Sequence, residues 1–235
     1  MTPEQQSQAK KSAAVAAARL VESGMAVGLG TGSTAAFLVD ELGRRVAEEN
    51  LRIVALPTSE KTAEQARRLK IPLVSFAEKA DLDLTIDGAD EVLPGSLYLI
   101  KGHGGALLRE KIVASASRRM IVIADETKIV AKLGTTMPVP VEVVPFGWEA
   151  TQKKLEKLGA KPKLREGANG GAYVTDGGHL ILDCDFGAIE NPKELAHHLD
   201  HVVGAVEHGM FLGFASKVFL GGPQGVRVLE KTETK

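Results

Sequence analysis

The sequence has one cysteine, Cys184, among its 235 residues, so no disulfide can form within the chain. Aromatic residues make up only 4% and show no pattern of stacking platforms for single-stranded nucleic acid. The net charge of -1 gives the whole molecule no electrostatic attraction for nucleic acid. No apolar run approaches the ~20 uncharged residues of a membrane-spanning helix. These absences predict a protein that binds neither nucleic acid nor a membrane.

The scarcity of cysteine also suits a reducing compartment, and we expect a cytoplasmic protein. Near the N-terminus, an Ala/Val stretch after Lys10 and Lys11 resembles the apolar part of a signal peptide. This stretch is short and ends in Arg19 and Glu22, which favours an amphipathic first helix instead.

Hydrophobic residues (44%) and charged residues (25%) occur in the proportions of an ordinary globular protein. Between residues 25 and 131, short apolar runs alternate with amphipathic segments. The runs predict strands at 25–29, 51–56, 82–86, 97–100 and 120–124, and the segments between them predict helices that include 34–48, 60–69 and 105–116. Such alternation is typical of a parallel sheet, and we expect a Rossmann-like α/β domain with helices on both faces.

The proline-rich stretch 137–140 marks a change of pattern. Beyond it the sequence predicts strands at 141–144, 172–175 and 180–183, helices at 148–158 and 192–203, and a turn at 176–178. This order indicates a smaller α+β domain with an antiparallel, ferredoxin-like sheet. The strand-like tail 211–229 is expected to return to the first domain. We therefore expect a catalytic domain of residues 1–133 with 206–235, and a smaller domain of residues 134–205.

Polar residues follow each predicted strand of the first domain. Ligands in open parallel sheets bind outside the carboxyl ends of the strands, so these segments are candidates for a site. They are 30–34 (GTGST), 57–59 (PTS), 87–90 (DGAD), 101–105 (KGHGG) and 125–128 (DETK). One polar segment is ordinary for a loop, but five at one edge of a sheet predict a binding site there.

The segment 28–34 (GLGTGST) enters a predicted helix, and amides and hydroxyls at a helix N-terminus can bind an anion. A dinucleotide-binding turn would have a third glycine at Ser33 and an acid after the next strand, which ends instead in Pro57. The Gly-Lys-Ser/Thr of a nucleotide P-loop is also absent. Two interpretations stay open: a loop for a compact phosphate monoester, or a helix capped by Ser33 or Thr34 with glycines for packing.

The segment 87–91 (DGADE) holds three acids within five residues. Taken alone, its Asp-Gly pair is typical of a tight turn. Asp87 and Asp90 at a strand end can also bind Mg²⁺ through oxygen ligands, or can transfer protons. Lys101 and Lys128 are expected nearby, and their charge lessens the need for a metal.

The segment 101–111 (KGHGGALLREK) is the most informative one. Its glycines allow backbone amides to approach a ligand closely. Glu110 shares a predicted helix face with apolar residues at spacings of three and four, including Leu107 and Val113. A carboxylate on an apolar stripe is partly desolvated, which raises its pKa toward that of a useful general base. The alternative is an exposed Glu110 in a solvated run of charges.

Two further candidates for metal chemistry are weaker. His197 and His201 have the i, i+4 spacing of zinc ligands, but they lack the acid of the protease pattern, so a solvated helix face is preferred. Cys184 alternates with Asp183 and Asp185 in a predicted strand and is expected in the core. We therefore expect no metal site and no cofactor.

Three segments resemble the site motifs of the A-type ribose-5-phosphate isomerases, in order and with the right spacing. They are 28–34 (GLGTGST), 87–91 (DGADE) and 101–111 (KGHGGALLREK), and 125–128 (DETK) matches a fourth element of the family. The resemblance extends over nearly the whole chain, with His103 standing where the family often has a smaller residue. It implies a two-domain α/β protein, usually a homodimer. The implied reaction interconverts D-ribose 5-phosphate and D-ribulose 5-phosphate through an enediolate, without a metal, in the non-oxidative pentose phosphate pathway.

By position, the resemblance implies that Glu110 is the base that moves the proton between C1 and C2. Asp87 and Asp90 would contact the sugar oxygens and assist ring opening and proton relay. Lys101 would stabilise the enediolate together with backbone amides. The implied substrate-binding residues are Thr31, Gly32, Ser33, Thr34, Asp87, Gly88, Ala89, Asp90, Lys101, Gly102, His103, Gly104 and Lys128, and Lys10 is expected near the phosphate.

Two other classes of protein have related features. A sugar-phosphate deaminase or a coenzyme A transferase has a related sheet, but the pair of segments 87–90 and 101–105 favours an isomerase. An effector-sensing domain of a sugar-phosphate regulator would usually carry a helix-turn-helix, and the ~24 residues before the first predicted strand are too few for one. The intact site motifs also favour catalysis over sensing.

Overall fold

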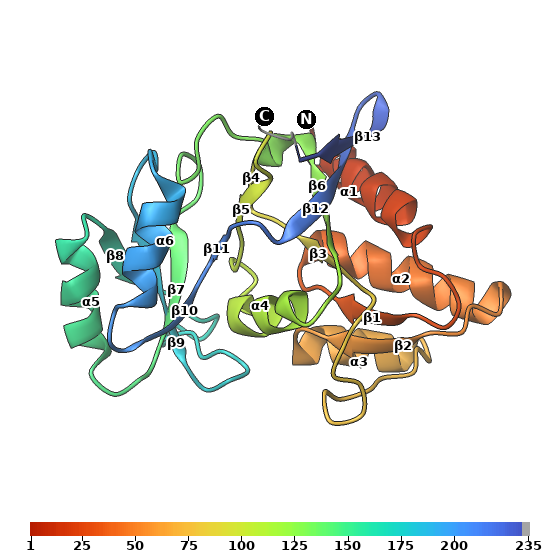
Figure 1. Cartoon of the computed structure of the whole chain (residues 1–235), viewed down its shortest axis with the longest axis horizontal. Helices are drawn as coiled ribbons and strands as arrows, with labels where there is room; N and C mark the ends of the chain where they lie inside the picture. Colours follow the sequence, from red (N-terminus) through yellow and green to blue (C-terminus); the bar gives the residue numbers. More distant parts are fainter. Residues whose placement is uncertain (232–235) are drawn as a thin grey trace.

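The computed structural model describes residues 1–231, which form three β-sheets and the helices that cover them (Figure 1). The largest sheet has six strands in the order β13-β12-β6-β3-β1-β2. Its strands are β1 (Ala26–Leu29), β2 (Val54–Pro57), β3 (Leu84–Gly88), β6 (Met120–Asp125), β12 (Ala215–Gly222) and β13 (Gly225–Glu230). All neighbours are parallel except β12 and β13, which form a hairpin. The predicted parallel sheet is confirmed, and so is the return of the tail to it.

Helices cover both faces of this sheet because its central strands bury both sets of alternating side chains. On one face lie α1 (Pro3–Ala18), α2 (Ser33–Glu48) and α3 (Glu60–Arg68), and on the other lies α4 (Leu107–Ser115). In β6, Ile121 and Ile123 join the first core, whereas Met120 and Val122 join the opposite one. Within residues 1–231, no helix is long and apolar enough to cross a bilayer.

Small residues allow α1 to pack closely on the sheet. The helix begins at a capping box, in which Thr2 and Gln5 each accept a hydrogen bond from the other's backbone N–H. A Cβ at Gly221 in β12 would lie 1.9 Å from the carbonyl oxygen of Ala9, so only glycine permits this approach. The contact brings Lys10 of α1 to the carboxyl edge of the sheet.

The strand predicted at 97–100 exists but lies outside the parallel sheet, so this part of the prediction is wrong. It is β5 (Tyr98–Ile100), which pairs antiparallel with β4 (Glu91–Leu93) and β11 (Met210–Phe211). Only a tight turn at 94–97 separates β4 from β5. A short apolar run carries no sign of which sheet it joins, because its periodicity is the same in either. The segment 101–105 therefore reaches the site from a second sheet.

The chain between β6 and β11 builds a four-stranded antiparallel sheet in the order β10-β7-β9-β8. Its elements are β7 (Val139–Val143), α5 (Trp148–Lys157), β8 (Lys161–Leu164), β9 (Leu180–Asp185), α6 (Pro192–Asp200) and β10 (Ala205–His208). This element and strand order is ferredoxin-like, as predicted. Cys184 is buried in the core of this unit. In Figure 1 the unit lies beside the large sheet, with β4, β5 and α4 between them.

The strand predicted at 172–175 is absent, and its place beside β9 is taken by β8. Residues 172–175 contribute only an isolated bridge between Glu166 and Ala172. β8 has the sequence KPKL, with exposed lysines and a proline, which an edge strand tolerates. The apolar alternation that usually marks a strand is therefore missing from β8.

The strand order of the large sheet creates a switch point between β1 and β3. The chain leaves β1 for β2 on one side, and then returns to β3 on the other. In open α/β sheets, ligands bind outside the carboxyl ends of the strands at such a point. The segments that leave β1 and β3 here are 30–34 and 87–90, both predicted as site segments.

Candidate active site

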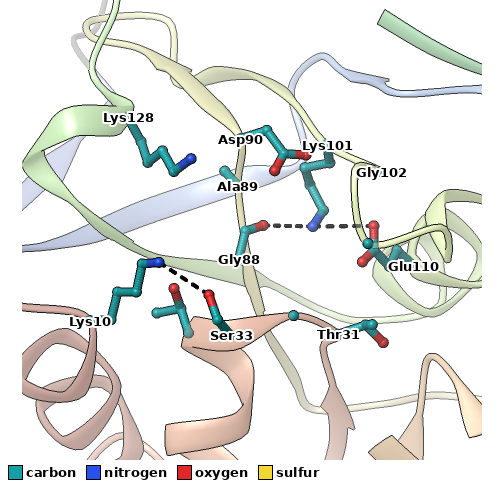
Figure 2. Close-up of a pocket in the computed structure, with 13 residues that line it drawn as sticks. Lys10, Thr31, Ser33, Gly88, Ala89, Asp90, Lys101, Gly102, Glu110 and Lys128 are labelled. Carbon is teal, nitrogen blue, oxygen red and sulfur yellow. Dashed lines mark hydrogen bonds and ion pairs between the residues drawn. The ribbon is translucent and has the colours of Figure 1, made fainter. Parts of the chain in front are cut away.

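A cavity opens at this switch point (Figure 2). Together with the solvent space at its open mouth, it encloses about 470 Å³. The lining residues are Lys10, Thr31, Gly32, Ser33, Thr34, Gly88, Ala89, Asp90, Lys101, Gly102, Gly104, Glu110 and Lys128. The structure thus brings together all the sequence-predicted site residues except Asp87 and His103, which do not line the cavity.

Asp87 is fully buried and fixes the ends of β1 and β3. Its Oδ1 accepts hydrogen bonds from the N–H groups of Thr31 at 3.1 Å and Gly88 at 2.7 Å. A Cβ at Gly30 would lie 2.1 Å from the same oxygen, so β1 can end here only in glycine. Burial raises the pKa of Asp87 against the opposing effect of the Lys101 ammonium.

Lys101 follows β5, and its ammonium lies between two carboxylates. Nζ is 3.1 Å from Oδ2 of Asp87 and 3.3 Å from Oε2 of Glu110. It also donates a hydrogen bond of 2.6 Å to the carbonyl of Gly88 (Figure 2). Burial favours the neutral amine, but the attraction of Asp87, Glu110 and Asp90 outweighs it and raises the pKa of Lys101. Lys101 is therefore a fixed positive charge that can stabilise a developing oxyanion.

Glu110 lies in the first turn of α4 and is only 2% exposed. The apolar stripe that surrounds it includes the buried Leu107 and Val113, as its spacing predicted. Burial, followed by the negative charge of Asp87, raises the pKa of Glu110 to about 8. A carboxyl group with a pKa near neutrality can both accept and return a proton.

The other end of the cavity is suited to an anion. Figure 2 shows Lys10 and Lys128 on the side of the cavity away from Glu110. Nζ of Lys10 donates to the hydroxyl of Ser33 at 3.2 Å, where α2 begins after Gly32 with its φ of +116°. Two ammonium groups and a helix N-terminus are the partners that a phosphate prefers.

Little in the sequence indicates the hydroxyl cluster that holds Thr31. Oγ1 of Thr31 lies 2.7 Å from Oγ1 of Thr58, 2.8 Å from Oγ of Ser59 and 3.2 Å from Oγ1 of Thr62. Thr58 and Ser59 were expected only as a polar strand end, and Thr62 was not expected at all. The signal available for Thr62 is its spacing from Ser59, which caps α3 by accepting from the Thr62 N–H.

Asp90 and His103 meet through the backbone. Oδ2 of Asp90 accepts a hydrogen bond from the N–H of His103 at 3.0 Å. The imidazole points elsewhere, because its Nε2 lies 3.1 Å from the carbonyl oxygen of Pro138. The predicted role of His103 in binding can therefore be served only by its backbone.

A model of the family described as ribose 5-phosphate isomerase A (phosphoriboisomerase A) matches residues 54–225 of the chain. The chain belongs to this family. It is 55% identical over 223 residues to ribose-5-phosphate isomerase A of Synechococcus sp. (strain JA-3-3Ab), which covers 95% of this chain and 97% of that protein. It is also 57% identical over 220 residues to the protein of that name from Gloeobacter violaceus, covering 94% and 95%.

Solved structures of ribose-5-phosphate isomerases have the same fold. The ribose 5-phosphate isomerase A of Methanocaldococcus jannaschii superposes with a TM-score of 0.91 at 40% identity, covering 95% of this chain and 99% of that one. A D-ribose-5-phosphate isomerase in complex with phospho-erythronic acid superposes with a TM-score of 0.92 at 39% identity, covering 95% and 98%. The chain is therefore an isomerase with the fold that its sequence predicted.

Possible metal ligands gather away from the cavity of this isomerase. Among residues 1–231, the one group of three with suitable spacing is Asp200, Glu207 and His208. Glu207 of that group is already paired with the Lys111 ammonium at 2.6 Å. His197 and His201 are exposed on the surface of the small domain, as expected. Between the carboxylates of the cavity, the ammonium of Lys101 takes the place that a cation would occupy.

We expect kcat/KM for ribose 5-phosphate to rise with pH and to level off above about pH 8. Below the Glu110 pKa of about 8, a growing share of this group is protonated and cannot accept a proton. The value of kcat/KM should then fall about tenfold for each pH unit, as expected for loss of a general base. Initial rates between about pH 6 and pH 9 measure this limb. A profile that is flat across this range would contradict the assignment.

Proposed function

We propose that this chain interconverts D-ribose 5-phosphate and D-ribulose 5-phosphate, with Glu110 as the base. The observation that carries the proposal is that one cavity has a proton-accepting group at one end and an anion-binding group of residues at the other. One end holds the buried carboxyl of Glu110 beside the Lys101 ammonium. The other holds Lys10, Lys128 and the N-terminus of α2. A phosphorylated sugar would bridge them, with its phosphate at the second end and its C1 and C2 at the first.

The first step forms the enediolate. In the open-chain aldose, the carboxylate of Glu110 removes the proton from C2, and the electron pair of that C–H bond forms the C1–C2 double bond. The carbonyl electrons move to O1, whose negative charge is stabilised by Lys101 and the amides of Gly102 and Gly104. Preorganised donors of this kind contribute strongly, since loss of one oxyanion donor can cost on the order of 10²–10³-fold in rate.

The second step completes the ketose. The protonated Glu110 returns its proton to C1, while a proton moves from O2 to O1, so that C2 becomes the carbonyl carbon. Asp90 assists ring opening and this relay from the cavity wall, and Asp87 assists through its ion pair with Lys101. The reaction is balanced without a metal or an external electron carrier, and we propose that none is used.

The remaining expectations join this proposal. The activity belongs to the non-oxidative pentose phosphate pathway. Family resemblance supports a homodimer, and the single buried thiol of Cys184 suits the reducing cytoplasm. The large and small sheets have separate cores, which supports two domains. We place the end of the small domain at residue 208 rather than 205, because β10 pairs with β7.

The test of this function is direct. Purified protein is dialysed against EDTA and incubated with ribose 5-phosphate, and the ketose is detected. Undiminished formation of ribulose 5-phosphate is the expected result. Loss of activity on chelation, with recovery on addition of Mg²⁺ or Zn²⁺, would contradict the metal-free mechanism and make Asp87 and Asp90 candidate ligands.

Replacing both Ser33 and Thr34 with Ala should raise the KM for ribose 5-phosphate more than it changes the binding of unphosphorylated ribose. The physical reason is that these residues begin α2, where hydroxyls and amides face the predicted phosphate position. Steady-state kinetics give the KM for ribose 5-phosphate, and competition by free ribose gives the affinity for the unphosphorylated sugar. Equal effects on both sugars would show that this loop does not bind the phosphate.

A further inference from the structure

Arg165 follows β8 in the small domain, and its guanidinium contacts the glycine loop at 102–104. Nη1 donates hydrogen bonds to the carbonyl oxygens of Gly102 at 2.9 Å and His103 at 3.3 Å. We propose that Arg165 is a positioning residue, which orients this loop so that its free amide faces the reacting oxygen of the sugar. The inference rests on the proposed function and assigns the small domain a part in it.

The geometry of the loop carries the proposal. Arg165 holds the carbonyl of the Gly102–His103 peptide, and Asp90 accepts from the N–H of the same peptide at 3.0 Å. Because a peptide unit is planar, these two contacts fix its orientation. In the next peptide, the guanidinium holds the carbonyl of His103, so the trans N–H of Gly104 points away from Arg165. Gly104 lines the cavity, and no acceptor for its N–H is present in residues 1–231.

The guanidinium is itself held in place. Its Nε donates to Oδ2 of Asp183 at 2.9 Å, and its Nη2 donates to the other oxygen of that carboxylate. The Tyr173 ring lies 6.0 Å from the central guanidinium carbon. The side chain of Arg165 is only 12% exposed. A planar fork bound to one carboxylate is well suited to presenting its remaining N–H groups in a fixed direction.

The loop has one hydrogen bond of its own, which the N–H of Gly105 donates to the carbonyl of Gly102 at 3.0 Å, and its glycines need further support. Gly102 has a φ of +107° and Gly105 a φ of +80°, conformations that glycine adopts but does not enforce. The hydroxyl of Tyr173 also packs against the loop, since a Cβ at Gly105 would lie 2.1 Å from it. Arg165 and Tyr173 therefore contact the loop from the small domain.

The test compares Arg165→Met and Arg165→Lys with Lys163→Met. Lys163 is an exposed cation on β8, two residues from Arg165, and within residues 1–231 no hydrogen bond or ion pair joins it to the loop. We expect Arg165→Met to lower kcat by about 10- to 100-fold, since a small misplacement of catalytic donors has effects of this size. Arg165→Lys, which can donate but lacks the fork, should recover part of the loss. Lys163→Met should behave as the unmodified protein.

Binding of two probes separates positioning from general damage. Phospho-erythronic acid carries a carboxylate where the enediolate would form, whereas inorganic phosphate occupies only the phosphate end. Arg165→Met should weaken binding of phospho-erythronic acid by about tenfold and of inorganic phosphate by less than about twofold. Asp183→Asn provides a second variant that leaves Arg165 in place but loosens it, and it should show the same selectivity with a smaller effect.

Unchanged kcat and unchanged phospho-erythronic acid binding in Arg165→Met would overturn the inference. Equal weakening of both probes, with a lower Tm, would also overturn it, because a purely structural role predicts that result. An unmodified protein that binds both probes but forms no ketose would contradict the proposed function instead. The two failures are therefore distinguishable.

Discussion

Glu110→Gln should lower kcat for ribose 5-phosphate by at least ~10²-fold, the lower range for loss of a general base. Glutamine keeps the shape and the hydrogen-bonding capacity of the side chain but cannot accept the C2 proton. KM should change little, because a group that acts mainly in the transition state contributes little to ground-state binding. Steady-state kinetics on the variant and on the unmodified protein measure both constants.

The same variant should be more stable than the unmodified protein at pH 8 to 9, on the order of 1 kcal/mol or more. Burial raises the pKa of Glu110 from 4.5 to about 8, so the folded chain binds this proton more tightly than the unfolded chain does. Stability is therefore lost as pH rises between these two values, and glutamine removes that loss. Thermal unfolding at about pH 5 and pH 9 should show a larger gain in Tm at the higher pH. A lower Tm at both would contradict the buried, unfavourable carboxylate.

Lys101→Met should lower kcat by about 10²–10³-fold, the cost of losing an oxyanion donor. The variant also removes the cation between Asp87 and Glu110, whose attraction lowers the pKa of each carboxyl. Both pKa values should therefore rise, and the limb over which kcat/KM rises with pH should move to higher pH. Rates measured between about pH 6 and pH 9 report the fall in kcat and the shift of the limb.

Lys128→Met is the matched control for Lys101→Met, since it removes a cavity lysine at the phosphate end. It should raise KM without moving the pH limb, because Lys128 is not a partner of Glu110. If Lys101→Met instead raised only KM, Lys101 would be a binding residue, and the stabilisation of the enediolate would have to come from the backbone amides alone.

The sequence predicted which residues gather at the cavity where chemistry and local pattern coincide. The segments after β1 and β3 lie at the carboxyl edge of a parallel sheet, and the topology of that sheet alone brings them together. The burial of Glu110 followed from its spacing to Leu107 and Val113, which is fixed by the period of one helix. Such features need no knowledge of distant contacts.

The sequence did not predict the features that depend on contacts between residues far apart in the chain. β5 was placed in the wrong sheet because three apolar residues fit either one, and pairing with β11 depends on residues that follow much later in the chain. β8 was missed because its outward lysines and Pro162 hide the usual alternation. The contact of Arg165 with Gly102 joins positions 63 residues apart, and no local pattern indicates it.

Exchange of the C2 proton with solvent tests the central claim most directly. The EDTA-treated protein is incubated with ribose 5-phosphate in D₂O, and deuterium in the recovered sugar phosphates is followed by NMR. If Glu110 carries the proton between C1 and C2 without a metal, the unmodified protein introduces deuterium and Glu110→Gln does not. Near-normal exchange and turnover in Glu110→Gln, together with loss of both in Asp87→Asn, would contradict this account and identify Asp87 as the base.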